Sequence, residues 1–145
     1  MPDFLPEKFK HETLIDVRFA DIDSMQHVNN AKYLTYIETA RINYLSDIIE
    51  LTVEHADLSV ILASAKLDFI LPIKLGDQVK IMTRCSRLGT KSFDLEYYLL
   101  RANEEDVVTT AKAITTLVGF DYKKNLTIAI PDIWKNKLKD FEGEI

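Results

Sequence analysis

The sequence predicts an α+β fold in which a five-stranded antiparallel sheet is covered on one face by a single long helix. Three observations lead to this fold. A stretch with apolar residues at helical spacing follows the first predicted strand, and four segments rich in β-branched and aromatic residues follow that helix. Short links of turn-forming residues join these segments, and such links require antiparallel neighbours. The chain has 145 residues, 47% of them apolar, which suffices for one domain with its own core.

The first strand and the helix precede the rest of the sheet. Residues 13–19, TLIDVRF, alternate between a face with charged side chains and an apolar face, which is typical of a half-buried strand. Helical spacing of apolar residues then predicts one long helix over about 31–49. Asn29 or Asn30 is suited to cap its first turn, because a short side-chain oxygen accepts a hydrogen bond from an otherwise unpaired backbone N–H.

The remaining strands are predicted from their β-branched and aromatic residues. They cover residues 59–72, 77–88, 91–102 and 107–122. Turn residues separate them at Pro72 to Asp77, at Gly89-Thr90 and at the NEED segment, 103–106. After the sheet, the segment 131–145 predicts a short closing helix, because Pro131 suits a first helical turn.

Two of these strands carry near-continuous apolar stretches, VILA within 59–72 and ITTLVGF within 107–122. The single helix can cover one face of the sheet only. We therefore expect a second copy of the chain to bury an edge or a face of the sheet, because an exposed apolar strand edge invites pairing.

Composition and charge exclude several classes of function. The chain carries 18 basic and 23 acidic residues, for a formal charge of -5, and the basic residues form no stripe that could neutralise phosphates. Nucleic acid is therefore not an expected partner. The single cysteine, Cys85, excludes an internal disulfide and a cysteine-based metal cluster and fits a reducing compartment. It is interpreted as a small buried strand residue.

Nothing in the pattern indicates targeting or division into domains. The N-terminal segment MPDFLPEKFKHETL has no apolar core of signal-peptide length, and no later apolar run approaches a bilayer span. We therefore expect a soluble cytoplasmic protein that does not insert into a membrane. No repeats or low-complexity tracts appear, so residues 1–145 are expected to form a single domain.

The segment RFADIDSMQHVNNAKYLTYIETAR, residues 18–41, concentrates polar residues where the first strand gives way to the helix. Free N–H groups point out of the first turn of a helix, and the helix dipole there favours negative charge. With a carboxylate from Asp21 or Asp23 in the preceding loop, the parts for acyl transfer are present. These parts are a nucleophile or base, and donors for the developing negative oxygen.

The neighbouring polar residues have both functional and structural interpretations. His27 and the asparagines Asn29 and Asn30 are suited to position water or the substrate carbonyl. Equally, Asp21 and Asp23 suit Asx turns, His27 suits a satisfied structural histidine, and the asparagines suit caps. The usual serine hydrolase is not indicated, because the chain has no Gly-x-Ser-x-Gly motif.

The polar cluster is also a candidate metal set. Carboxylates and imidazole are common metal ligands, so Asp21, Asp23 and His27 are candidate ligands. The other histidines, His11 and His55, stand isolated in the sequence and supply no second ligand cluster. We therefore expect neither a metal ion nor a cofactor.

Three stretches of the chain carry a family resemblance. They are the polar run quoted above, ASAKLDFILPIKLGDQVKI at 63–81 and LGTKSFDLEYYL at 88–99. Together they resemble the hotdog-fold thioesterases of the 4-hydroxybenzoyl-CoA thioesterase group, and the resemblance covers about residues 12–122. It implies a five-stranded antiparallel sheet wrapped around one long central helix. It also implies that two chains pair side by side into one continuous sheet, so a homodimer or homotetramer is expected.

The resemblance also implies roles within the candidate site. The second aspartate of the family's Asp-x-Asp motif falls on Asp23, which implies a nucleophile or general base. Backbone N–H groups near Asn30 and Ala31 would polarise the thioester carbonyl, and a histidine used by some bacterial members falls on Asn30. The Asp-x-Asn-x-His set of plant acyl-carrier-protein thioesterases falls on Asp23, Met25 and His27. Met25 departs from that set, because a thioether cannot donate as an amide does; His27 is then a positioning group.

Substrate-binding positions are implied in the same way. They are Tyr33 on the helix, at an acyl pocket shared with the partner subunit, and Ser64, Arg87, Lys91 and Ser92, toward the acyl pocket or the nucleotide-bearing arm of coenzyme A. Arg87 and Lys91 are suited to meet phosphates. The structural alternatives are that these two are solvated turn charges and that Tyr33 is plain core.

The sequence thus predicts an acyl-CoA thioesterase that hydrolyses an acyl or aromatic acyl thioester to the free acid and the thiol. A carboxylate acts as nucleophile or base, and the helix N-terminus stabilises the oxyanion. Three alternatives remain open: an acyl-carrier-protein thioesterase, a hotdog hydratase or dehydratase, and a non-catalytic dimer that binds acyl thioesters. The hydratase has less support, because its hydration-loop motif is not visible.

Overall fold

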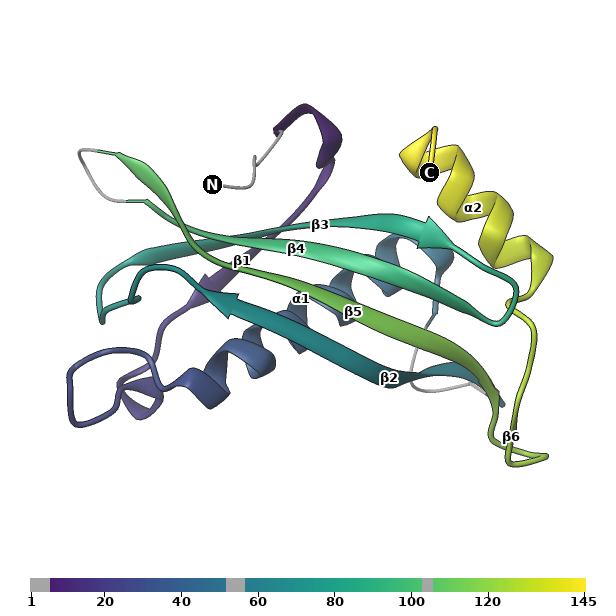
Figure 1. Ribbon diagram of the computed structural model, residues 1–145, viewed down its shortest axis with the longest axis horizontal. Coiled ribbons are helices and arrows are strands. Elements are labelled where there is room, and N and C mark those ends of the chain that lie inside the picture. Colours follow the sequence, from purple (N-terminus) through teal and green to yellow (C-terminus); the bar gives the residue numbers. More distant parts are fainter. Residues whose placement is uncertain (1–5, 52–56, 103–105) are drawn as a thin grey trace.

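The computed structural model describes residues 6–51, 57–102 and 106–145 (Figure 1). The strands are β1 (His11–Asp16), β2 (Leu58–Phe69), β3 (Gln78–Leu88), β4 (Ser92–Ala102), β5 (Val107–Asp121) and β6 (Leu126–Thr127). The helices are α1 (Asn30–Ile49) and α2 (Asp132–Glu142), with short 3₁₀ turns η1 (Pro6–Lys8) and η2 (Phe19–Asp21). The predicted α+β architecture, with one long helix inserted after the first strand, is confirmed.

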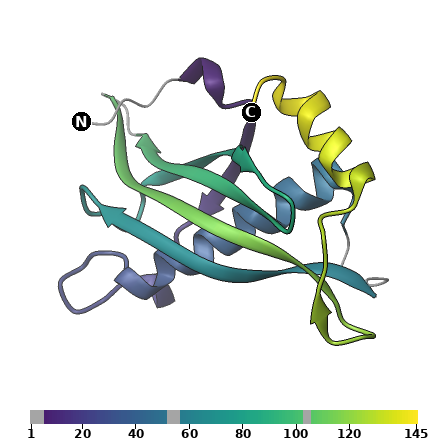
Figure 2. The same cartoon turned by 45° about the vertical axis from the view of Figure 1, so that its right-hand side comes forward.

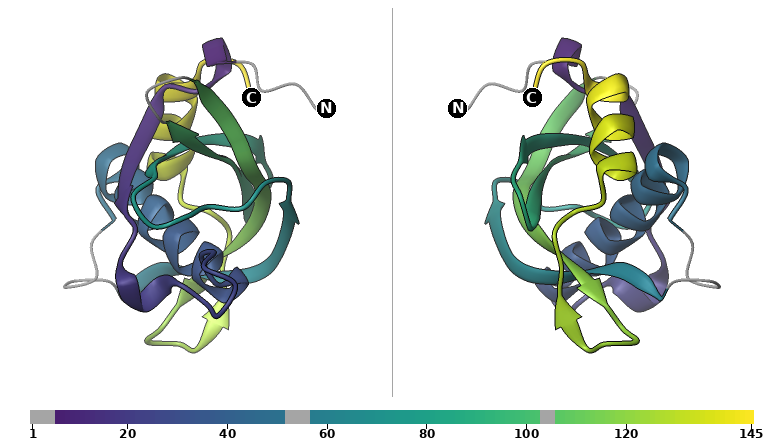
Figure 3. Two further views of the ribbon diagram at one scale, coloured as in Figure 1. Left: turned by 90° about the vertical axis from the view of Figure 1, so that its left-hand side faces the viewer. Right: turned by 90° about the vertical axis from the view of Figure 1, so that its right-hand side faces the viewer.

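The strands form one antiparallel sheet in the order β1-β3-β4-β5-β2, and β6 pairs with β5. The pairs β3–β4 and β4–β5 follow one another along the chain, as their short predicted links require. Most of the link predicted at 103–106 lies outside the described residues. Turned toward its ends, the molecule shows the strands curving around α1 (Figure 2, Figure 3). The sheet therefore wraps one long helix, as predicted.

The core lies between α1 and the inner face of the sheet. Side chains along β3 and β4 alternate between buried and partly exposed over most of their length, so that every second one points at the helix. Fully buried members include Ile37 and Tyr44 of α1 and Ile81, Cys85, Leu95, Leu99 and Leu117 of the sheet. Because burying one large apolar side chain contributes roughly 1.5–3 kcal/mol, this layer holds the helix firmly against the strands. The predicted burial of the single cysteine is confirmed.

Helix α1 begins where the polar loop ends. Asn29 is its N-cap, and the side-chain oxygen accepts a hydrogen bond from the N–H of Ala31 at 2.9 Å. The helix stops at Glu50, which adopts the left-handed backbone conformation with a φ of 57°. The predicted bounds, about 31–49, therefore agree closely with the observed ones. Among the helices that the structure describes, none is long and apolar enough to cross a membrane.

Helix α2 covers the edge of β3 that β1 leaves open. β1 pairs with β3 only as far as His11, which lies opposite Thr83. Beyond that point the backbone N–H of Cys85 donates to Oε1 of Glu142 at 3.1 Å, and the hydroxyl of Tyr44 donates to the same oxygen at 2.6 Å. One carboxylate thus joins α2 to both α1 and β3. The predicted closing helix is confirmed.

The predicted bounds of two strands are wrong. The first strand, predicted over 13–19, runs over His11–Asp16, because the chain turns into η2 soon afterwards. Phe19 is consequently 83% exposed instead of lying on a buried strand face. The second strand, predicted over 59–72, ends at Phe69, where a loop leads toward β3. Both errors fall beside the polar loop, so they affect the surroundings of the candidate site.

Strand β2 keeps one edge free. It pairs with β5 along the other edge, and no strand in the described ranges pairs with the free one. Its central residues, from Leu62 to Lys66, are exposed. A second copy of the chain is expected to bury such an edge, and this expectation stays a prediction.

Candidate active site

The polar loop between η2 and α1 folds back on itself beside the helix N-terminus (Figure 1). Ile22 and Val28 form an antiparallel bridge at its base. Above the bridge, the N–H of Asp23 donates to the carbonyl of His27 at 2.8 Å. The tip turns at Gln26, whose φ of 65° lies in the left-handed region. The loop is therefore a small closed hairpin, which gives its side chains defined directions.

Asp23 has one carboxylate oxygen held by the backbone and one that is free. Its Oδ1 accepts the N–H of Met25 at 2.8 Å and the N–H of His27 at 3.2 Å. No hydrogen-bond donor in the described part of the chain contacts Oδ2. The Asx-turn interpretation and the catalytic interpretation are therefore compatible, because one oxygen forms the turn and the other is available to a substrate.

Two hollows meet at this loop. The larger, of about 570 Å³, is lined by Asp23, Met25 and His27, and also by Phe19, Lys74 and Leu75. The smaller, of about 310 Å³, shares the first three residues and adds Asn30, Tyr33 and Phe69. Asp23 thus borders both spaces, and three predicted site residues line the smaller one with it: His27, Asn30 and Tyr33.

The first turn of α1 has one free backbone donor, and it belongs to a residue that lines the smaller hollow. The N–H of Ala31 is taken up by the cap, and the N–H of Lys32 donates to the carbonyl of Asn29 at 2.8 Å. The N–H of Asn30 has no acceptor among the described residues. Of the two positions implied by the family resemblance, Asn30 therefore offers the free N–H, while that of Ala31 is already used.

His27 is fixed through its main chain and leaves its ring free. Its N–H and carbonyl both bond to Asp23, and it forms a bridge with Lys74 in the segment before β3. His27 lines both hollows, and its imidazole makes no hydrogen bond to the described residues. The ring therefore has no protein partner in the described part of the chain, and its role as a positioning group stays a prediction.

Asp21, the other candidate carboxylate, is fully occupied and 0% exposed. Its Oδ2 accepts the hydroxyl of Tyr36 at 2.6 Å and the N–H of Arg18 at 3.0 Å, and Oδ1 accepts the Arg18 guanidinium at 3.1 Å. Burial raises the pKa of this carboxyl, but the hydrogen bonds from Tyr36 and Arg18 outweigh burial, so its pKa lies below the usual value. Asp21 is an ionised structural group, and Asp23 is the one with a free oxygen.

The candidate metal set is not assembled. Within residues 6–51, 57–102 and 106–145, no group of three or more His, Cys, Asp and Glu is placed to hold a metal ion. Asp21 directs its carboxylate at Tyr36 and Arg18 instead of at Asp23 and His27. The residues that line the hollows therefore offer acid–base and hydrogen-bonding chemistry.

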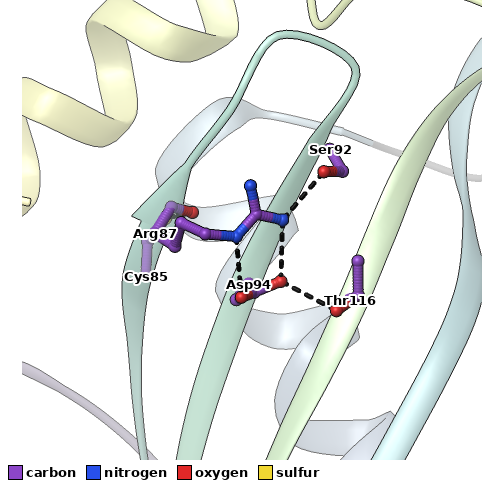
Figure 4. A network of polar contacts seen from close by, with 5 residues as sticks. All are labelled: Cys85, Arg87, Ser92, Asp94 and Thr116. Atoms are coloured by element: carbon purple, nitrogen blue, oxygen red, sulfur yellow. Dashed lines mark hydrogen bonds and ion pairs between the residues drawn. The ribbon is translucent and has the colours of Figure 1, made fainter.

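The hairpin between β3 and β4 carries three predicted substrate contacts, Arg87, Lys91 and Ser92. Arg87 forms a bidentate ion pair with Asp94, at 2.8 and 3.0 Å, and donates to the hydroxyl of Ser92 at 2.8 Å (Figure 4). Thr116 donates to the same aspartate at 2.8 Å. The Arg87 guanidinium lowers the pKa of the Asp94 carboxyl, although partial burial opposes it. Arg87 and Ser92 are thus engaged within the hairpin, and Lys91 is exposed.

A single chain does not bring this hairpin to Asp23. β3 starts near the polar loop and runs for 11 residues to Leu88, a span of about 35 Å at the usual strand rise. Figure 1 shows the polar loop and the hairpin at opposite ends of the sheet. The remaining predicted contact, Ser64, is exposed in the middle of β2 and lines neither hollow. The roles of these four residues stay predictions.

Comparison with known protein families decides the class of this chain. The family described as the thioesterase-like superfamily matches residues 17–138. The chain belongs to the thioesterase-like superfamily. The resemblance inferred from the sequence motifs is thereby confirmed, and the predicted thioester hydrolase class agrees with it.

Individual relatives of this thioesterase-like chain agree over nearly its whole length. It is 31% identical over 130 residues to the long-chain acyl-CoA thioesterase FadM of Escherichia coli K12, which covers 88% of this chain and 96% of FadM. A thioesterase from Thermus thermophilus, solved in complex with coenzyme A and Zn, is 30% identical with a TM-score of 0.80, covering 96% and 98% of the two chains. A thioesterase superfamily protein from Jannaschia sp. CCS1, at 21% identity and a TM-score of 0.85 over 94% and 86%, supports the fold alone. The hotdog fold is confirmed.

Sequence reasoning missed part of the walls of the hollows. Phe19 and Phe69 lie in predicted strands, and Lys74 and Leu75 lie in the predicted turn between Pro72 and Asp77. None of the four is a predicted site residue, yet all four line a hollow. A signal was present in the Lys74–Asp77 turn, KLGD, which places a lysine on a loop. Periodicity within a segment does not indicate which other loop it contacts, so the pairing of this turn with the loop at Asp23 could not be found.

Proposed function

We propose that this protein is an acyl-CoA thioesterase whose catalytic group is Asp23. The observation that carries the proposal is one hollow lined by both Asp23, whose Oδ2 has no donor among the described residues, and Asn30, whose backbone N–H has no acceptor among them. Attack on a carbonyl carbon needs a nucleophile or base, and the oxygen that becomes negative needs a donor. Membership of the thioesterase-like superfamily supports the same reaction class.

Two routes use the same atoms. In one, Oδ2 of Asp23 attacks the thioester carbon, the C–S bond breaks as the thiolate leaves, and water hydrolyses the mixed anhydride to restore the carboxylate. In the other, Oδ2 takes a proton from a water molecule that attacks the same carbon, and the C–S bond then breaks as the thiol leaves with that proton. In both routes the N–H of Asn30 and the dipole of α1 stabilise the negative oxygen. His27 faces the same space and positions the water or the carbonyl.

The two hollows suit the two arms of a thioester. An acyl arm and a thiol arm leave the reacting carbon in different directions, and Asp23 borders both spaces. The smaller hollow has an aromatic wall, in which the rings of Tyr33 and Phe69 meet edge to face at 5.0 Å. FadM is named for long-chain acyl-CoA, and the Thermus thioesterase binds coenzyme A. These relatives favour coenzyme A thioesters over carrier-protein thioesters as substrates.

We also propose that the active form is a homodimer paired through the free edge of β2. In an antiparallel pair, the Phe69 end of one strand lies opposite the Leu58 end of its partner. At the Leu58 end, β2 lies next to β5, whose Val118 pairs with both Ile61 of β2 and Ser92 of β4. Pairing would therefore bring the partner's β3–β4 hairpin to the end of the sheet that carries Asp23. The predicted contacts at the hairpin would then act across the dimer.

A thiol-release assay tests the function. The panel contains short-chain, long-chain and aromatic acyl-CoA esters, and the same acyl groups on an acyl carrier protein. We expect catalysed hydrolysis of at least one acyl-CoA ester, with a kcat/KM of at least about 10⁴ M⁻¹s⁻¹ for a preferred substrate. Rates equal to the uncatalysed background across all the acyl-CoA esters would contradict the proposal.

A further inference from the structure

Asp21, which is buried, makes one contact through its main chain and one through its side chain beside the candidate site. Its backbone carbonyl accepts the N–H of Asn29, the cap of α1, at 2.8 Å. Its side chain accepts the hydroxyl of Tyr36, in the second turn of α1, at 2.6 Å. Neither Asp21 nor Tyr36 lines either hollow, so these contacts are not made for a substrate.

The position of these bonds in the chain matters for catalysis. The loop that carries Asp23 starts directly after Asp21 and ends directly before Asn29, so the bond between Asp21 and Asn29 closes the loop. The bond from Tyr36 then fixes the closed loop to the helix whose first free N–H belongs to Asn30. The Ile22–Val28 bridge shapes the loop internally, and Asp21 is the residue that ties it through a side-chain hydrogen bond to the helix carrying the oxyanion donor.

We infer that the hydrogen bond between Asp21 and Tyr36 is a positioning device that holds the Asp23 carboxylate and the Asn30 N–H at the separation that thioester hydrolysis requires. The inference rests on the function proposed above. Asp21 and Tyr36 act through other residues and are positioning residues. A misplacement of about 1 Å at a reacting group can cost on the order of 10²-fold in rate, so a bond of this kind affects catalysis without touching substrate.

The hydrogen bond between Tyr36 and Asp21 should be kept over the pH range of an enzyme assay. Arg18 provides a charged group that contacts the Asp21 carboxylate, through its guanidinium at 3.1 Å, and favours the ionised form. Burial raises the pKa of the Tyr36 hydroxyl, and the bond to Asp21 raises it further, so the hydroxyl remains a donor. In an Asp21→Asn variant the side-chain amide would point an N–H at a donor, either Arg18 or Tyr36. Changing Tyr36 instead removes the hydrogen bond without adding such a clash, so Tyr36 is the better residue to substitute.

Helix α1 provides a matched control for removing this hydroxyl. Tyr44 is buried on the same helix and donates to Oε1 of Glu142, also at 2.6 Å. Its partner lies on α2 and not on the loop at Asp23. The variants Tyr36→Phe and Tyr44→Phe therefore each lose one hydroxyl bonded to a carboxylate, at different ends of the helix.

The experiment compares wild type, Tyr36→Phe and Tyr44→Phe by melting temperature, by kcat and KM on a hydrolysed acyl-CoA ester, and by amide hydrogen exchange at Met25, His27 and Asn29. We expect both variants to melt at lower temperature. Tyr36→Phe alone should exchange faster at these three amides and lose about tenfold in kcat, with KM changed less than about twofold. Tyr44→Phe should keep the wild-type kcat and loop exchange.

The inference is overturned if Tyr36→Phe and Tyr44→Phe show the same amide exchange in the loop and the same kcat. The bond between Asp21 and Tyr36 would then be purely structural. Failure of the proposed function looks different, because the wild type would then hydrolyse no thioester. In that case hydrogen exchange still decides the inference, since unchanged protection of the three amides would show that Tyr36 does not hold the loop.

Discussion

At the residue scale, Asn29 keeps the first turn of α1 in place by accepting the N–H of Ala31. We predict that Asn29→Ala lowers the free energy of unfolding by about 1 kcal/mol, the usual cost of a lost cap. It should also lower kcat, because a frayed first turn no longer aims the N–H of Asn30. Urea denaturation and thiol release measure the two effects.

Asn29→Asp keeps an acceptor oxygen and serves as the control. A normal kcat in Asn29→Ala would argue against Asn30 as the oxyanion donor.

The residue scale is also where sequence patterns reach their limit. The motif identifies two aspartates, and its residue types indicate acyl transfer. Which aspartate is structural depends on a hydrogen bond from Tyr36, 15 residues along the chain from Asp21. No periodicity specifies that contact. The cap is a similar case, because either Asn29 or Asn30 satisfies the sequence rule and only the backbone geometry selects Asn29.

At the scale of elements, the β3–β4 hairpin depends on the ion pair between Arg87 and Asp94. Because the Arg87 side chain is 47% exposed, screening limits its contribution to roughly 1 kcal/mol. The arginine lowers the pKa of Asp94 in the folded protein. A lowered pKa adds stability that is complete above the ordinary carboxyl pKa, about 4, and is lost as the pH falls through the folded-state value.

We therefore predict that Arg87→Ala is less stable than wild type near pH 7 and that this difference shrinks as the pH falls below about 4. Urea denaturation at a series of pH values measures it. Lys91→Ala, on the same hairpin and exposed, is the control and should follow the wild-type curve. A stability difference that stays constant down to about pH 3 would exclude this ion pair as its cause.

The type and position of most elements can be predicted from local sequence, whereas the ends of some strands depend on the segments that they contact. The bounds of α1, β3 and β4 agree with the predicted ranges within about one residue, because caps and tight turns are local signals. β1 and the end of β2 do not, because their lengths depend on strands and loops distant in the sequence. The covering of β3 by Glu142 of α2 is equally non-local, since it needs the free N–H of Cys85 on another element.

At the scale of the whole molecule, the proposed dimer makes a prediction about mass. Light scattering or sedimentation of the wild type should give twice the chain mass of 16.7 kDa, or a larger even multiple. Leu62→Lys places a charge on the free edge of β2, and edge charges oppose strand pairing, so this variant should dissociate at higher concentration than wild type. Ile114→Lys is the control, because Ile114 is 45% exposed against 46% for Leu62 but lies on β5.

The oligomer also bears on activity, since the β3–β4 hairpin reaches Asp23 only across the proposed dimer. A monomeric Leu62→Lys protein should bind acyl-CoA more weakly, with a higher KM. A wild type that is monomeric at all assay concentrations yet fully active would contradict the dimer, and would remove Arg87, Lys91 and Ser92 from the proposed substrate contacts.

In the proposed mechanism the free carboxylate oxygen of Asp23 carries out thioester hydrolysis, and a comparison of three proteins decides whether it does. Thiol release from a hydrolysed acyl-CoA ester is measured for wild type, Asp23→Asn and Asp16→Asn, the last being an exposed aspartate on β1 outside both hollows. Asparagine keeps the Oδ1 acceptor for Met25 and His27, so the loop should stay folded. We predict a kcat about 10²- to 10⁴-fold lower in Asp23→Asn and unchanged in Asp16→Asn. A folded Asp23→Asn protein with wild-type kcat would contradict the account.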